Sequence, residues 1–459
     1  MQKTRKKEKN QSFIKSAVTI AAGGFVAKII GALYRIPLTN LIGGHGMGLY
    51  QMVYPVYCLL LTVSATGIPS SIAKLTAERI GQGVSTKPLF KTAMKLFVLI
   101  GLAGSVLMAG VAPFLSAAQN SKEIMGGYFA LAPSVLLVSA ISVFRGYFQG
   151  RNNMTPTALS EITEQIVKVG VGLLFAYLFR ADVVKAVVFL LLAVSVSELV
   201  ALLLMVFLFR RIPTPHESKK EGERVAIKTV LKMSIPVTLS SMLLPLSALL
   251  DSVLAVRLLG KYASDAVTLY GLFSGGAVTV INLPVSVCYG IAAASVPALS
   301  RAKAERESGK IKEKNGKKPS VSKRLFFSLG ITALVSIPSA IGLYVFAEPA
   351  AKIIFKSLKG EEFSTLVRLI KTFSVSAFTL SCVQTLAACL TAQGKPQYAA
   401  FSMLVAVVVK TGVYTALLQN PQISVFGLAH ATNICYLVAF LLDLVYNLYV
   451  IKKSKRKES

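Results

Sequence analysis

Apolar residues gather along this chain in long runs, and short polar segments separate one run from the next. About twelve runs are long enough to cross a bilayer as a helix, which needs ~20 mostly apolar residues. They span approximately residues 13–35, 50–73, 90–115, 124–148, 157–180, 183–209, 231–257, 266–297, 323–347, 365–391, 397–418 and 424–450. The pattern predicts an all-α, polytopic membrane protein with about twelve transmembrane helices.

The composition agrees with a polytopic membrane protein, and the positions of the cations explain the high net charge. Hydrophobic residues make up 54% of the chain, and 50 Lys and Arg oppose 20 Asp and Glu, for a formal net charge of +30. In a soluble protein this balance would suggest nucleic acid as a partner. Here the cations concentrate in alternate short junctions, which is the positive-inside pattern, so we expect no nucleic acid. The same asymmetry predicts that both termini are cytoplasmic.

A polar linker at residues 210–230 divides the predicted spans six and six. We therefore expect an N-terminal six-helix lobe at residues 1–209 and a C-terminal six-helix lobe with a basic tail at 231–459. A weak internal repeat supports two pseudo-symmetric lobes. Residues 149–170 and 393–412 each begin with Gln-Gly and continue through a Pro to Lys-x-Gly near the middle of a helix. The alternative is that short apolar segments agree by composition alone.

The first apolar run carries charge where a membrane helix normally has none. Gly24, Lys28, Gly31 and Arg35 are spaced four, three and four residues apart, so they share one face of a helix with about 3.6 residues per turn. A cation at bilayer depth costs from ~2.5 to more than 10 kcal/mol unless it faces protein or water. We interpret this face as one wall of a cavity that receives an anion. The alternative is that Lys28 is paired inside the bundle purely for packing.

Cations in other spans extend this hypothesis. Lys168 and Lys410 are further candidates for binding an anionic substrate. Arg145 and Arg257 are weaker candidates because they lie near helix ends and could extend to the membrane surface. Lys and Arg are natural partners of a multiply charged phosphate group, and Arg binds it in bidentate fashion.

Acidic residues in the spans leave two roles open. Asp251, Glu161, Glu164 and Glu198 could bind a coupling proton or sodium ion, or could be static counter-ions of the cations. Glu164 lies four residues before Lys168, and Glu161 lies seven before it. An ion pair within one helix face could therefore satisfy Lys168.

The sequence contains no pattern typical of a metal site or a catalytic centre. The five cysteines lie inside apolar runs without a CxxC pair, and the three histidines have no partner at metal-ligand spacing. We therefore expect no metal, no cofactor and reduced thiols. A membrane enzyme such as a glycan polymerase would need a large external domain or a DxD or HExxH motif, so we expect a protein that is not an enzyme.

The segment KIIGALYRIPLTNLIGGHGMGLYQM, residues 28–52, with GIPSSIAKL after it, carries a family resemblance. It resembles the stage V sporulation protein B group of polysaccharide transporters, which is related to the MurJ-like lipid II flippases. Both belong with the multidrug/oligosaccharidyl-lipid/polysaccharide exporters. The resemblance implies a V-shaped pair of six-helix lobes around a central cavity, which opens alternately to each side of the bacterial cytoplasmic membrane. It also places Lys28 and Arg35 in that cavity.

The function implied by the resemblance is flipping of an undecaprenyl-pyrophosphate-linked sugar, either a lipid II-like peptidoglycan precursor or a polysaccharide repeat unit. Cell-wall synthesis or sporulation would be the setting. A proton, a sodium ion or the membrane potential could drive transport, and membrane lipids are the other partners. Two rivals remain open: a multidrug or cation antiporter of the same fold, whose cationic cargo a Lys- and Arg-rich cavity would repel, and a non-transporting scaffold for cell-wall or spore assembly.

Overall fold

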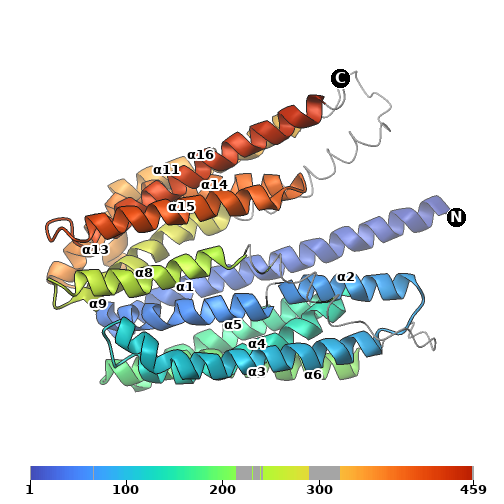
Figure 1. Ribbon diagram of the computed structural model, residues 1–459, viewed down its shortest axis with the longest axis horizontal. Helices are drawn as coiled ribbons and strands as arrows, with labels where there is room; N and C mark the ends of the chain where they lie inside the picture. The colour runs from blue at the N-terminus through green and yellow to red at the C-terminus, as the bar shows by residue number, and fades with distance from the viewer. Residues whose placement is uncertain are drawn as a thin grey trace. The chain divides into compact units, whose positions relative to one another are not determined.

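The computed structural model is built from long helices (Figure 1). It describes the backbone of residues 2–65, 67–212, 230, 238, 241–288 and 321–456. Within these ranges the side chains of residues 2–25, 28, 29, 32, 64, 65, 67, 321, 324 and 454–456 are not described. No strand occurs among the described residues, and the all-α prediction is confirmed.

The helices follow the chain in a simple order. The first part contains α1 (Gln2–Ala65), α2 (Gly67–Gly81), α3 (Lys87–Ala118), α4 (Met125–Gly150), α5 (Thr155–Leu178) and α6 (Val183–Arg211). The later part contains α8 (Leu243–Leu259), α9 (Ala266–Gly271), the π-helix η1 (Leu272–Ala277), α11 (Val321–Val345), α12 (Ala347–Ile354), α13 (Gly360–Phe373), α14 (Val375–Ala392), α15 (Pro396–Leu417) and α16 (Phe426–Arg456).

The ends of several helices agree with the predicted spans. For α3, α4, α5, α6 and α15, each end lies within three residues of the predicted limit. The apolar runs therefore located these elements well, because each run is bounded by polar or helix-breaking residues. The predicted span 365–391 is divided in the structure, since α13 ends and α14 begins around Ser374.

The first two predicted spans are joined more tightly than the sequence suggested. The junction is a single residue within α1, Gly43, with φ 69° and ψ −174°, a conformation essentially restricted to glycine. Arg35 lies within electrostatic range of Tyr54 and Cys58, whereas a straight helix would separate residues 35 and 58 by about 35 Å. The chain therefore reverses direction at Gly43, and α1 consists of two segments folded back on each other.

Nine helices among the described residues are long and apolar enough to cross a membrane. One of them, Leu33–Gly81, contains the reversal at Gly43. The nine do not include the 24-residue α5, whose apolar pattern is interrupted by Glu161, Glu164 and Lys168. The chain is thus a polytopic membrane protein, as predicted.

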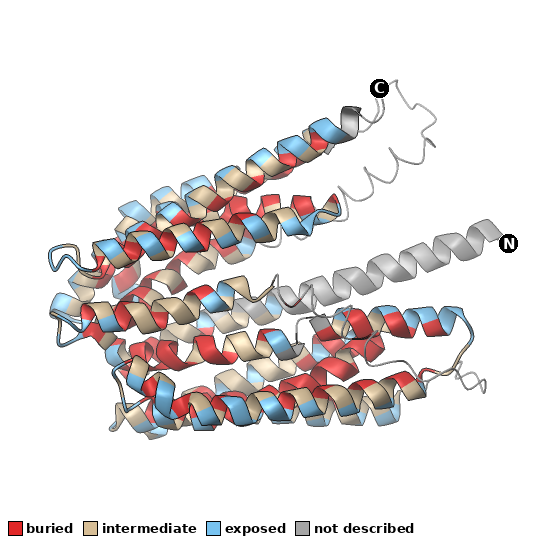
Figure 2. Cartoon of the chain, in the orientation of Figure 1, coloured by how far each residue is buried: buried red, intermediate tan, exposed pale blue. Residues whose placement is uncertain are grey.

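The exposed surface of these helices is apolar, which is the reverse of a soluble protein. On α3 the buried residues Leu89, Ala93 and Phe97 follow one side at a spacing of four. Large apolar residues cover the opposite side, where Val106 is 65% exposed and Phe114 is 74% exposed. Figure 2 shows the same alternation of buried and exposed sides on other helices. An apolar exposed face of this kind is suited to lipid tails.

Contacts divide the chain into two compact units, Met1–Val253 and Leu254–Ser459. In the first unit α4 is the central helix and packs against α2, α3, α5 and α6. Small residues permit this closeness, since a Cβ added at Gly146 would lie 2.7 Å from the carbonyl oxygen of Pro69 on α2. In the second unit α16 packs against α13, α14 and α15. The predicted linker 210–230 lies largely outside the described residues, so the lobe limits stay a prediction.

Candidate functional site

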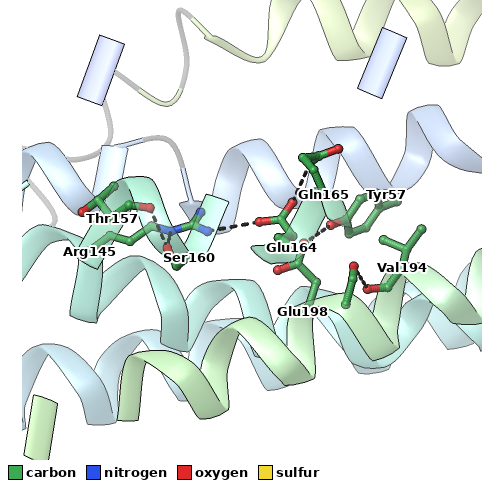
Figure 3. Close-up of polar contacts among 9 residues, drawn as sticks. Tyr57, Arg145, Thr157, Ser160, Glu164, Gln165, Val194 and Glu198 are labelled. Carbon is green, nitrogen blue, oxygen red and sulfur yellow. Dashed lines mark hydrogen bonds and ion pairs between the residues drawn. The ribbon is translucent and has the colours of Figure 1, made fainter. Parts of the chain in front are cut away.

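The most developed polar site of the first unit begins with an ion pair between α4 and α5. Arg145 donates from Nη2 to Glu164 Oε2 at 3.1 Å and from Nε to Ser160 Oγ at 2.9 Å. The side chains of Arg145 and Glu164 are only 14% and 17% exposed. Figure 3 shows the guanidinium of Arg145 lying along α5 toward Glu164. Arg145 is therefore held inside the unit, although its place near a helix end made it a weaker candidate in the sequence.

A second contact brings α6 into the same site. Tyr57, on the second segment of α1, donates its hydroxyl to Glu198 Oε1 at 3.2 Å (Figure 3). Glu198 is 2% exposed, and its other oxygen, Oε2, has no hydrogen-bond partner. The carboxyl group is therefore enclosed by protein and only partly satisfied. Such a group is uncommon in a folded interior and often has a functional reason.

Electrostatic interactions link these residues with two further cations. Lys168 interacts with Glu164, Glu198 and Arg35. Glu161 and Glu198 interact with Arg145. The charges thus come from α1, α4, α5 and α6 and form one group. We call this group the first-unit charge cluster and define it by six residues: Arg35, Arg145, Lys168, Glu161, Glu164 and Glu198.

The charges of the cluster are balanced, since three cations oppose three carboxylates. The sequence left open whether the acids are counter-ions of the cations or coupling groups, and the ion pair of Arg145 with Glu164 is a contact of the first kind. Balance is physically expected, because an uncompensated charge in a low-dielectric interior costs several kcal/mol. The predicted pairing of Lys168 with the carboxylates of its own helix stays a prediction. The direct ion pair of Glu164 is with Arg145, while Lys168 interacts electrostatically with the same carboxylate.

The local sequence explains why the charges meet. Glu161, Glu164 and Lys168 recur at spacings of three and four, so they share one face of α5. Two glycines let α1 approach that helix closely. A Cβ added at Gly31 would lie 3.2 Å from Gln165 Oε1, and one at Gly172 would collide with the Tyr34 hydroxyl. Gly31 on α1 and Gly172 on α5 therefore allow the two helices to pack closely.

The remaining predicted residues lie elsewhere. The side chain of Lys28 falls outside the described residues. Lys410 is buried at 6% exposure on α15 in the second unit. Asp251 lies half-buried on α8, and Arg257 is exposed in the last turn of the same helix.

Three polar residues of the site were not anticipated. Tyr57 orients Glu198, Ser160 accepts a hydrogen bond from Arg145, and Gln165 donates to Glu164 Oε1 at 3.2 Å. Tyr57 had a recognisable signal, because Tyr50, Tyr54 and Tyr57 are spaced four and three apart on one helical face. Ser160 and Gln165 had none, since such residues occur in many membrane helices. Among the described residues, no group of three His, Cys, Asp or Glu side chains could bind a metal ion.

Comparison with known proteins gives a consistent picture. The family described as polysaccharide biosynthesis protein matches residues 13–303. Stage V sporulation protein B of Bacillus subtilis (strain 168) is 26% identical over 434 residues, which are 92% of this chain and 80% of that protein. Lipid II flippase MurJ of the same organism is 24% identical over 176 residues, which are 35% of this chain and 31% of that protein.

Solved structures share the fold at low sequence identity. The inward-facing conformation of a multidrug resistance MATE family transporter of the MOP superfamily has a TM-score of 0.76 and 15% identity. The likeness covers 94% of this chain and 96% of that one.

Proposed function

Because the chain belongs to the polysaccharide biosynthesis protein family, whose members are transporters and not enzymes, we propose that it is a flippase for a lipid-linked sugar. The cargo would carry an undecaprenyl-pyrophosphate group, either on a lipid II-like precursor or on a polysaccharide repeat unit. Relatives named as a sporulation protein and as a lipid II flippase support this cargo class. Transport would follow alternating access between two six-helix lobes, with both termini in the cytoplasm.

The first-unit charge cluster is the observation that carries the proposal. Intramembrane ionisable groups are expensive and commonly mark substrate pathways. A pyrophosphate is multiply anionic, so Arg35, Arg145 and Lys168 are suitable partners for it, with Lys28 as a further candidate on the same face as Arg35. Lys410 would serve the same purpose on α15, and Arg257 at the end of α8.

Charge balance gives the cluster a mechanism for binding and release. In the described state Glu164 occupies the guanidinium of Arg145. An incoming phosphate oxygen would replace that carboxylate, and the freed glutamate would then need a proton or another cation. Release of the phosphate would restore the internal ion pair. Exchange of one anionic partner for another avoids leaving a buried cation unpaired, which costs ~3–5 kcal/mol.

The acids of the cluster suit a coupling role. Glu198 has one oxygen bonded to Tyr57 and the other without a partner, so it could accept a proton when the cluster gains an anion. Glu161 and Glu164 would act with it, and Asp251 is the further candidate on α8. A proton or sodium gradient or the membrane potential would supply the driving force.

A reconstituted flipping assay tests the proposal. Proteoliposomes would contain a fluorescent undecaprenyl-pyrophosphate-linked sugar, and quenching from outside would report its movement between leaflets. We expect Arg35→Ala with Lys168→Ala to reduce the flipping rate at least ~100-fold, equivalent to ~2.7 kcal/mol. Lys91→Ala removes an exposed cation of α3 and should flip normally. Normal flipping by the double variant would refute the role of the cluster.

A second candidate function is supported by the three glutamates. A cation antiporter of the same fold would use Glu161, Glu164 and Glu198 to bind a positively charged drug. The same vesicles, loaded with a fluorescent organic cation, discriminate between the two. Cation efflux without lipid flipping would favour the antiporter. The absence of both activities in well-folded protein would favour a scaffold.

A further inference from the structure

The second unit contains a buried polar network that the charge cluster does not include. Asn447 of α16 donates from Nδ2 to the backbone oxygen of Leu386 at 3.1 Å and to that of Asp443 at 2.8 Å. Gln393 of α14 donates from Nε2 to Asn447 Oδ1 at 2.8 Å. These residues join α14 to α16, and the side chain of Asp443 lies one helical turn away from Asn447.

Asp443 is almost fully enclosed and only half satisfied. It is 1% exposed, and its Oδ1 has no hydrogen-bond partner. Its side chain is hydrogen-bonded to Ser402 of α15, which is itself fully buried. The Ser402 hydroxyl donates to the backbone oxygen of Tyr398 at 3.0 Å.

The hydroxyl of Ser402 can donate to either of two neighbours, because it rotates about its Cβ–Oγ bond. One neighbour is the backbone oxygen of Tyr398 and the other is Asp443. A single hydroxyl hydrogen cannot serve both, so Ser402 supplies at most one hydrogen bond to the carboxyl group, and Oδ1 has none. A carboxylate anion at this position would therefore be poorly solvated.

The described surroundings of Asp443 offer no cation that would compensate a negative charge. Four described elements pack against α16: α11, α13, α14 and α15. The titratable groups at the level of Asp443 are uncharged in their usual forms, namely Cys389 on α14, Tyr398 on α15 and Tyr446 on α16, which stacks on Tyr398. At that level α11 presents Leu325 and Leu329, and α13 meets α16 farther along, where Phe373 contacts Tyr436. Lys410 lies eight residues beyond Ser402, about 12 Å along α15.

Asp443 differs in its charged neighbours from Glu198, the buried carboxyl group of the first unit. Glu198 accepts a hydrogen bond from Tyr57 and interacts with Glu164, Arg145 and Lys168, so its protonation is linked to the other charges of the cluster. Among the described residues no cation interacts with Asp443. A carboxylate in such a place would cost several kcal/mol, and it would take up a proton instead. A sodium ion is less suitable, since the oxygen of Asn447 is already engaged by Gln393.

We propose that Asp443 is a proton-binding site of the second unit, separate from the first-unit charge cluster. The proton converts the carboxylate to a neutral acid, and Oδ1 is the oxygen that has no partner in the described arrangement. Loss of the proton would leave a buried anion between α14, α15 and α16, so the packing of these helices is linked to proton binding. The further claim that this proton is exchanged during transport depends on the proposed flippase function.

Infrared difference spectroscopy on the full-length protein in lipid tests the site directly. Wild type should show the carbonyl band of a protonated carboxylic acid that is absent from Asp443→Asn. Ser402→Ala should shift this band because the hydrogen bond between the two side chains is lost. Glu198→Gln should leave it in place. A difference spectrum that contains only ionised-carboxylate bands would overturn the proposal, as would a band that responds to sodium but not to pH.

The flipping assay tests the coupling role separately. An imposed pH gradient should change the flipping rate of wild type and of Lys91→Ala, and Asp443→Asn should lose this response. An unchanged response in Asp443→Asn would overturn the coupling role. If no protein flipped the lipid under any condition, the proposed function would fail, and the infrared band would still decide whether Asp443 holds a proton.

Discussion

The ion pair between Arg145 and Glu164 allows the energetics of the cluster to be measured. Its two side chains are 14% and 17% exposed, and Arg145 also donates to Ser160. Arg145→Met would remove the direct ion-pair partner of Glu164, which we expect to lower the free energy of unfolding by ~3–5 kcal/mol. An ordinary neutral hydrogen bond between membrane helices averages only ~0.6 kcal/mol. A loss of stability near ~3–5 kcal/mol would identify a buried ion pair, whereas a loss near ~0.6 kcal/mol would identify an ordinary neutral hydrogen bond.

A double-mutant cycle separates the pair from its neighbours. The four proteins are wild type, Arg145→Met, Glu164→Gln and the double variant, unfolded in mixed micelles and followed by circular dichroism. We expect a coupling energy of ~1–3 kcal/mol, because the residues are in contact and share a buried site. Lys74 and Glu78 provide a control, since they are 3.9 Å apart but 63% and 50% exposed, and such pairs contribute ~0.3–0.5 kcal/mol. Coupling for Arg145 and Glu164 no larger than in this control would refute our description of the cluster.

Two further predictions concern the chain outside the cluster. Gly43→Ala should lower the free energy of unfolding by ~1–3 kcal/mol, because its φ of 69° and ψ of −174° are strained for any side chain. Gly110→Ala is the control, since a Cβ there meets nothing within 4 Å, and equal losses in the two variants would contradict the reasoning. A backbone hydrogen bond from Lys185 lowers the pKa of Asp182 below 3.8. The capping contact is therefore fully present above that pH and is lost as pH falls through the folded-state pKa. Amide exchange at Lys185 should speed up, relative to a protein that keeps the cap, only under acid conditions. If Asp182→Ala had the same pH profile of exchange as wild type, the capping role of Asp182 would be contradicted.

The fold could be predicted largely from the sequence because membrane helices obey a strong length and hydropathy rule. The ends of α3 and α6 follow from where their apolar runs meet polar residues. The junction at Gly43 could not be predicted, because GGHGMG offers four glycines and the pattern does not say which one takes the unusual backbone conformation. Tertiary contacts between the two segments of α1 decide this.

The site could be predicted in its residue types but not in its pairing. Arg35, Lys168 and Glu198 are recognisable because charges are rare in apolar runs. Which charges meet depends on how α1, α4, α5 and α6 are rotated about their axes. Arg145 appeared peripheral for this reason, since the sequence does not reveal that Ser160 and Glu164 lie opposite it. The environment of Asp443 was equally hidden, because it depends on how α14 and α15 pack against α16.

The reversal at Gly43 places two members of the site on one continuous segment of chain. Arg35 precedes the glycine and interacts with Lys168, whereas Tyr57 follows it and donates to Glu198. A change of backbone angle at Gly43 would alter the angle between the two segments, and with it the separation of Arg35 from Tyr57. Under the proposed flippase function, phosphate binding by Arg35 and the hydrogen bond from Tyr57 to Glu198 would then both depend on the conformation of this one glycine.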